Sequence, residues 1–127
     1  MIALDASVLV AHFSAGDEHH ADATSVLDAG AAEGFLLHTM TLTEVLVGGA
    51  RVGRAAQLLS DITAMGVAVA PRDDDEPLRL AELRVATGLK LPDCCVLDTA
   101  VTHGARLATF DRSLAEAARR IGVVVLN

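Results

Sequence analysis

Short apolar runs recur along the chain, and most of them follow a glycine that ends a helical pattern of hydrophobic positions. Such a glycine takes the left-handed conformation that closes a helix at little cost, so each run is a candidate strand. Together with the apolar start of the chain, the pattern predicts five strands at residues 2–4, 35–37, 67–69, 106–108 and 123–126. Their residues are apolar without alternation, which is typical of strands buried on both faces of a parallel sheet.

Apolar positions at helical spacing occupy the segments between these strands. They predict helices at residues 6–13, 19–32, 42–63, 76–88, 93–103 and 112–120. Strands that alternate with helices favour right-handed crossovers. We therefore predict one α/β domain over residues 1–127, with a five-stranded parallel sheet between two helical layers, a three-layer α/β/α architecture.

The composition agrees with such a domain and excludes several other classes. Of 127 residues, 52% are hydrophobic, which suffices for a core without disulfides and excludes disorder. No stretch near 18 apolar residues is free of charge, so we expect no membrane span. The only cysteines, Cys94 and Cys95, are adjacent and such pairs rarely bridge, which favours a reducing cytoplasm.

The net charge of −7, from 10 basic and 17 acidic residues, argues against general nucleic-acid binding through a basic surface. It leaves open an enzyme that meets a polyanion through bound metal ions. The acidic run at residues 73–76 is followed by Pro77 and precedes a helical pattern. We interpret this run as a solvated turn whose charges favour a helix N-terminus.

Four carboxylates fall at predicted strand ends or helix starts. Asp5 ends the first strand, Asp111 follows the fourth, and Glu44 and Asp93 lie in the first turns of helices. Because the strand-to-helix junctions of a parallel sheet share one edge, these acids can converge there. Taken singly, each also has a structural interpretation: an N-cap for Asp5 and Asp111, a capping box from Thr41 to Glu44, and an ordinary acidic helix start for Asp93.

A cluster of these carboxylates has a definite chemistry. Two carboxylates about 4 Å apart repel by roughly 4 kcal/mol at an effective dielectric near 20, so a cluster takes up protons or binds cations. All-oxygen ligands suit Mg²⁺ or Mn²⁺ rather than zinc. Such ions activate water and stabilise the attacking and leaving oxygens of a phosphodiester, so the pattern indicates phosphate chemistry.

At these residues the chain resembles a PIN domain, and specifically the VapC toxins of bacterial toxin–antitoxin pairs. The likeness covers the whole chain. It is carried by Ile2-Ala3-Leu4-Asp5-Ala6-Ser7-Val8-Leu9, by Thr43-Glu44-Val45-Leu46, by Leu91-Pro92-Asp93 and by the stretch from Ala100 to Asp111. Each motif alone is weak, but their order and spacing in a small α/β chain make the combination specific.

The resemblance implies a Mg²⁺- or Mn²⁺-dependent endoribonuclease. Its metal ligands would be Asp5, Glu44, Asp93 and Asp111. Ser7 and Thr109 would assist through hydroxyl hydrogen bonds to a carboxylate or to metal-bound water. The implied reaction is attack by metal-activated water in line with the departing 3′ oxygen, which leaves a 5′-phosphate and a 3′-hydroxyl.

The resemblance also implies partners. The substrate would be RNA, with a tRNA anticodon loop and an rRNA stem-loop both open. A cognate VapB-type antitoxin would cover the site with its C-terminal segment. A homodimer and a toxin–antitoxin hetero-oligomer are expected. From the composition, we expect no membrane partner.

Asp98 and Arg112 each have two open interpretations. Asp98 lies five residues after Asp93, about 140° around a helix, so the two do not share a face. It either supports the metal site, as a further ligand or by orienting a ligand or water, or is an ordinary surface acid. Arg112, next to Asp111, either meets substrate phosphate near the metal or is an exposed residue at a helix start.

The histidines show no zinc spacing. We expect His19 and His20 to be solvated, His12 and His38 to be packed, and His103 to lie at a helix C-terminus.

Three alternative functions compete with the toxin hypothesis. A PIN nuclease of RNA processing would share the four acids, and a non-catalytic PIN-like interaction module would be expected to have lost one. A signalling receiver domain needs paired acids after its first strand, an aspartate after the third and a lysine after the fifth. Here the first strand ends in one acid, Pro71-Arg72 follows the third strand, and Lys90 is the only lysine.

Overall fold

Five short strands alternate with seven helices in the computed structural model, which describes residues 1–127. The strands are β1 (Ile2–Leu4), β2 (Phe35–Leu37), β3 (Val67–Val69), β4 (Arg106–Ala108) and β5 (Val125–Leu126). The helices are α1 (Ala6–Phe13), α2 (His20–Gly30), α3 (Thr39–Arg51), α4 (Ala55–Ala64), α5 (Glu76–Thr87), α6 (Leu91–Thr102) and α7 (Arg112–Arg120).

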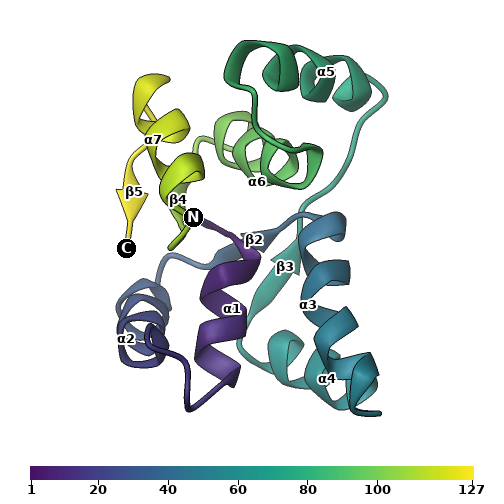
Figure 1. The fold of residues 1–127 in the computed structure, drawn as a ribbon, viewed down its shortest axis with the longest axis vertical. Helices are drawn as coiled ribbons and strands as arrows, with labels where there is room; N and C mark the ends of the chain where they lie inside the picture. Colours follow the sequence, from purple (N-terminus) through teal and green to yellow (C-terminus); the bar gives the residue numbers. More distant parts are fainter.

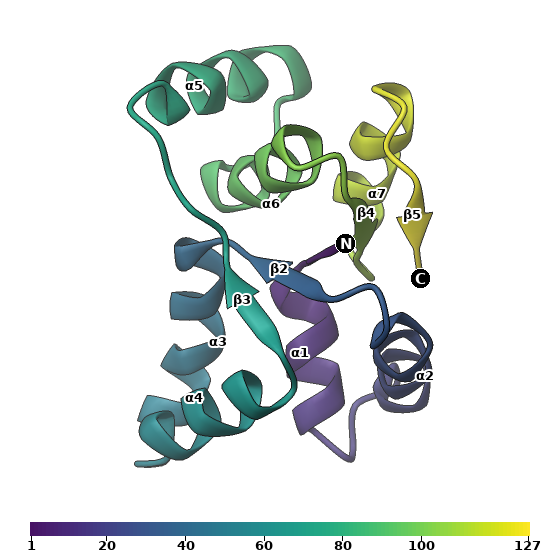
Figure 2. The ribbon, with the colours of Figure 1, turned by 180° about the vertical axis from the view of Figure 1, so that it is seen from behind.

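The strands form one parallel sheet in the order β3-β2-β1-β4-β5, with β1 at its centre. Helices α1 to α4 cover one face, and α6 and α7 cover the other, with α5 packed on the outer side of α6 (Figures 1 and 2). The predicted three-layer α/β/α architecture is confirmed. The strand order also excludes the receiver alternative, because that fold orders its strands 2-1-3-4-5.

Successive residues of β1 point to opposite faces of the sheet. Ile2 and Leu4 pack in a core cluster with Val8 of α1, whereas Ala3 packs in a second cluster with Leu97 of α6. Both faces are therefore buried. This explains why the strands lack the polar alternation of a half-exposed sheet.

The prediction of a single helix at residues 42–63 is wrong, because two helices, α3 and α4, form a hairpin over this segment. The chain turns at Gly53, whose φ of +72° cannot continue a right-handed helix. Close packing across the hairpin needs a second glycine, since a Cβ on Gly49 would lie 3.2 Å from the Cα of Ala55. Both halves keep apolar positions at helical spacing, so the periodicity alone did not reveal the break.

The other boundaries differ by a few residues at most. The predicted strand at 123–126 is paired only over Val125–Leu126, and the helix predicted at 19–32 spans His20–Gly30. The predicted glycine turns are confirmed by positive φ at Gly34, Gly66, Gly104 and Gly122. None of the seven helices has the length and hydropathy that a membrane span requires.

Candidate metal centre at the carboxyl edge of the sheet

Asp5 follows β1 directly and occupies the N-cap position of α1, but its side chain makes no capping hydrogen bond. Its Oδ2 instead accepts hydrogen bonds from the hydroxyls of Ser7, at 2.6 Å, and Thr109, at 2.8 Å. The residue is only 7% exposed, and its Oδ1 makes no hydrogen bond. The carboxylate is thus fixed through one oxygen and keeps the other free, which a plain capping role does not explain.

Both hydroxyls also accept a backbone hydrogen bond from the loop after β4. The N–H of Phe110 donates to Oγ of Ser7, and the N–H of Asp111 donates to Oγ1 of Thr109, each at 3.0 Å. Each hydroxyl therefore accepts one hydrogen bond and donates its only proton to Asp5, which fixes the direction of that proton. The sequence predicted hydroxyl bonds to a carboxylate, but the link to the loop backbone was missed.

Asp111 lies across the same edge and begins α7. Its Oδ1 accepts a hydrogen bond from the N–H of Leu114 at 2.9 Å, so the capping interpretation is confirmed for this residue. Its Oδ2 makes no hydrogen bond, and the residue is exposed. Capping therefore uses one oxygen and leaves a second available for another partner.

Asp93 lies in the first turn of α6 and is partly buried. Burial raises the pKa of its carboxyl to about 6, with further contributions from the charges of Asp111, Asp5 and Glu44, against a lowering by Lys90. The four predicted acids are thus near enough to act on one another. Repulsion of this kind marks a site that favours protons or cations.

Glu44 reaches this edge from α3, where it is exposed. Its pKa is raised by partial burial and by the charge of Asp5. The predicted capping box is wrong, because α3 begins at Thr39 and Glu44 lies in the second turn. The N-cap is His38, whose Nδ1 accepts the backbone N–H of Met40 at 2.9 Å.

The donor set fits a hard divalent cation. None of the four carboxylates forms a salt bridge, and all the available donors are oxygen atoms. As the side chains lie, no three of them converge closely enough to chelate a single ion. Magnesium is commonly held by one or two carboxylates and its own waters, so this looser arrangement suits it better than it suits zinc.

Asp98 does not belong to this cluster of free carboxylates. It is 5% exposed, and Arg79 donates to both of its oxygens, from Nε at 2.8 Å and from Nη2 at 3.1 Å. The interpretation as a surface acid is wrong. Arg79 also donates to Asp73 at 2.9 Å, and this hydrogen bond lowers the pKa of the Asp73 carboxyl.

A buried histidine–carboxylate pair was missed at the same edge. Glu76, the first residue of α5, is hydrogen-bonded to Nε2 of His38, and both residues are less than 10% exposed. Because Nδ1 of His38 accepts a backbone N–H, we assign the ring proton to Nε2, which donates to Glu76. Glu76 is thus not part of a solvated turn, and the interpretation of residues 73–76 is wrong there.

The other histidines hold no metal-like arrangement, but two of them are not simply solvated as expected. The ring of His19 stacks on Phe110, with ring centroids 4.7 Å apart and 8° between the planes. Nδ1 of His20 lies 2.9 Å from the carbonyl oxygen of Ala11. His12 is packed as expected, with Nδ1 3.0 Å from the hydroxyl of Thr24.

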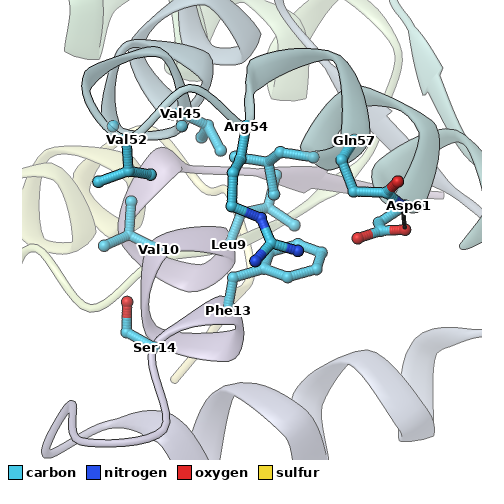
Figure 3. A pocket seen from close by; sticks show the side chains of 12 residues that line it. Leu9, Val10, Phe13, Ser14, Val45, Val52, Arg54, Gln57 and Asp61 are labelled. Carbon is cyan, nitrogen blue, oxygen red and sulfur yellow. Dashed lines mark hydrogen bonds between the residues drawn. The ribbon is translucent and has the colours of Figure 1, made fainter.

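A largely apolar groove lies between α1 and the α3–α4 hairpin (Figure 3). Val10 and Phe13 line one side, Val52 the other, and the side chain of Arg54 extends over the opening. None of the four acids lines it. The groove is therefore separate from the candidate metal centre.

Comparison with known proteins agrees with this geometry. The sequence profile of the PIN domain matches residues 2–120. No curated protein sequence matches the chain significantly. Among solved structures, VapC20 from Mycobacterium tuberculosis, a toxin that cleaves the sarcin–ricin loop, is similar with a TM-score of 0.79 and 21% identity, over 98% of this chain and 97% of that chain.

Two further structures share the fold. A toxin–antitoxin complex from Klebsiella pneumoniae has a TM-score of 0.74 and 24% identity, over 98% of this chain and 94% of that chain. FitAcB from Neisseria gonorrhoeae has a TM-score of 0.74 and 22% identity, over 100% of this chain and 97% of that chain. The profile match includes all four segments that carry the acids, and it covers most of the chain. The chain therefore belongs to the PIN-domain family.

Proposed function

We propose that this protein is a metal-dependent endoribonuclease and the toxin of a toxin–antitoxin pair. The observation that carries the proposal is the group of four carboxylates without salt-bridge partners at the carboxyl edge of a PIN-domain sheet, where the pKa of Asp93 is raised to about 6. The similar structures support the toxin assignment, since they include a sarcin–ricin loop cleaving toxin and a toxin–antitoxin complex.

The candidate metal ligands in this proposal are Asp5, Glu44, Asp93 and Asp111, and the ion is Mg²⁺ or Mn²⁺, which one or two of these carboxylates and its own waters would hold. When bound, such an ion would activate water and offset the charge of a phosphodiester. Ser7 and Thr109 act as positioning residues. By holding Oδ2 of Asp5, they leave its Oδ1 free in a fixed orientation.

The proposed substrate is a tRNA or rRNA, cut to leave a 5′-phosphate and a 3′-hydroxyl. The proposed protein partner is an antitoxin that covers the acids, in a hetero-oligomer built on a homodimer of this chain. Support comes from similar structures described as complexes, VapBC2 from Rickettsia felis bound to a promoter DNA fragment and FitAB bound to the IR36 DNA fragment.

Cleavage of total cellular RNA by the purified protein tests the proposal. Reactions contain Mg²⁺, Mn²⁺ or EDTA, and the 5′ ends of the products are mapped. We expect discrete metal-dependent cuts with 5′-phosphates, reduced below detection in Asp5→Asn, which removes a charge but little volume.

Asp28→Asn provides the matched control, because Asp28 is an exposed carboxylate on α2 without a salt bridge. It should retain full activity. Undiminished cleavage by Asp5→Asn would refute the assignment of the site, and cleavage unaffected by EDTA would refute the metal dependence.

A further inference from the structure

A polar hollow opens beside the candidate metal centre, at the start of α7. It has a volume of about 610 Å³, within the range of ligand sites in proteins. Asp111, His19 and Phe110 line it together with Arg112 and Arg119. We propose that this hollow is a subsite for the RNA nucleotide adjacent to the scissile phosphate; this inference rests on the proposed function.

Asp111 connects the two regions. It lines the hollow, and its charge contributes to the raised pKa of Asp93 in the carboxylate cluster. Its Oδ1 is used to cap α7, which holds the side chain at the boundary between cluster and hollow. When a phosphate of an RNA strand lies at the acids, the next nucleotide of that strand therefore lies at the hollow.

Two unpaired guanidinium groups supply the charge for phosphate contact. Arg112 and Arg119 are both exposed, and neither forms a salt bridge. They lie seven residues apart, which places them on one face of α7, about 10 Å apart along its axis. Arginine presents several N–H donors that match phosphate oxygens, so these two side chains suit successive phosphates of one strand.

A stacked aromatic pair supplies a surface for a base. The rings of His19 and Phe110 lie nearly parallel, at 4.7 Å, and the side chain of His19 remains 43% exposed. Phe110 is partly buried against the core, so it holds the pair in place while His19 offers the exposed ring. Nucleic-acid bases stack on such rings with little dependence on sequence.

Two acids at the rim act against the arginines. Asp22 and Glu116 also line the hollow, and both are exposed. They weaken the local positive potential, so the hollow suits one stacked nucleotide with flanking phosphates rather than a polyanion in general. Removing either charge, as in Asp22→Asn or Glu116→Gln, should tighten RNA binding, which is the opposite of the effect of the arginine variants.

The test measures the affinity of the full chain for a fluorescein-labelled ten-nucleotide single-stranded RNA of mixed sequence, across a salt series. Arg112→Gln and Arg119→Gln should each weaken binding and lower the slope of log K against log salt by about 0.7. Arg120→Gln is the matched control, because Arg120 is exposed on the same helix but does not line the hollow. It should change neither quantity.

Stacking is tested separately at His19. His19→Ala should weaken binding by about 5- to 150-fold, whereas His19→Phe, which keeps a ring, should retain affinity. In RNA cleavage assays, the arginine variants should have a higher KM than the unchanged protein, and their kcat should stay near its value. Melting temperatures of all variants establish that the fold is retained.

Each outcome bears on the inference. Equal losses in Arg119→Gln and Arg120→Gln would show an unspecific charge effect and overturn it. Arginine variants that bind RNA normally but no longer bind a co-expressed antitoxin would overturn it in favour of a protein contact. If no form of the protein cleaves RNA while the variants still weaken probe binding, the proposed function fails, its subsite for the nucleotide next to the scissile phosphate is overturned, and the hollow is an RNA-binding site only.

Discussion

Thr109 has no exposed surface, and its hydroxyl joins two polar groups of the candidate site. It accepts the N–H of Asp111 and donates to the carboxylate of Asp5. Thr109→Val keeps the shape but leaves the N–H of Asp111 without a partner and removes one of the two hydroxyls that hold Asp5. We therefore expect a loss of about 1–3 kcal/mol in the free energy of unfolding and a strong loss of cleavage. Chemical denaturation and an RNA cleavage assay check this expectation.

Thr109→Ser retains the hydroxyl and should recover most of the activity. Thr99 provides a matched control, since it is also buried, but its hydroxyl bonds only the carbonyl of Cys95 in its own helix. Thr99→Val should leave cleavage unchanged. A Thr109→Val variant as active as the unchanged protein would mean that the orientation of Asp5 does not matter.

Asp93 makes stability depend on pH in a definite direction. Its pKa is about 6 in the folded chain against 3.8 as the ordinary value, so between these pH values the folded chain holds a proton that the unfolded chain has lost. The free energy of unfolding without metal should therefore fall as pH rises from about 4 to about 6. The lost stability, about 1–3 kcal/mol, should stay lost at higher pH.

The variant Asp93→Asn isolates this contribution, because it cannot ionise. In EDTA, its advantage in melting temperature over the unchanged protein should grow across this pH window and then level off. Other groups, such as Asp73, whose pKa is lowered by Arg79, change the stability with pH in the opposite direction. They contribute equally in both proteins, so the difference between the two melting temperatures does not contain them. A constant difference from pH 4 to pH 7 would contradict the electrostatic description of the cluster.

At the scale of elements, α6 is buried along most of its length, and this decides the role of Asp98. A charge in such a helix needs a partner, and Arg79 provides it from α5. Arg79→Met should lower the melting temperature by several degrees, because it leaves a buried carboxylate unpaired. The double variant Arg79→Met/Asp98→Leu should recover much of that loss.

A melting curve for each single variant and for the double variant checks this coupling. Simple addition of the two single effects would show that the α5–α6 pair contributes nothing beyond packing. The carboxylate cluster should be unaffected throughout, since Asp98 is hydrogen-bonded to Arg79 and Thr102 and does not contribute to the raised pKa of Asp93 or Glu44. Retained cleavage in the folded double variant is therefore part of the expectation.

At the scale of the whole molecule, folding brings together four like charges from four separate segments of the chain. The acids follow β1 and β4 and lie on α3 and α6, so their repulsion opposes the folded state alone. A cation that binds only the folded chain should stabilise it by about 2.7 kcal/mol at 100 times its dissociation constant. Thermal melts with Mn²⁺ or Mg²⁺ should therefore show a higher melting temperature than melts in EDTA.

Asp5→Asn should reduce this metal-dependent shift and raise the melting temperature in EDTA, because one repelling charge is gone. Asp28→Asn should change neither value. If Mn²⁺ shifts the unchanged protein and Asp5→Asn equally, the ion binds elsewhere on the acidic surface.

The local sequence pattern was sufficient to predict much of the fold and which acids form the cluster. Hydrophobic periodicity and the positions of the glycines predicted the sheet. Because the carboxyl ends of parallel strands share one edge, Asp5 and Asp111 were predicted to lie together. The same pattern failed over residues 42–63, where both helices of a hairpin share one apolar periodicity. It also failed for Glu76, because a carboxylate in an acidic run carries no local sign that His38, 38 residues earlier, will bury it.

Local propensity and periodicity set the strand ends and helix starts, so they were enough to predict which residue types reach the carboxyl edge of the sheet. Which of the carboxylates stay free depends on how distant segments pack together. Asp98 is paired by Arg79 and Glu76 by His38, whereas Asp5, Glu44, Asp93 and Asp111 have no salt-bridge partner. The partner of each carboxylate depends on the packing of segments distant in the chain, because the side chains that surround a buried charge either stabilise or destabilise it.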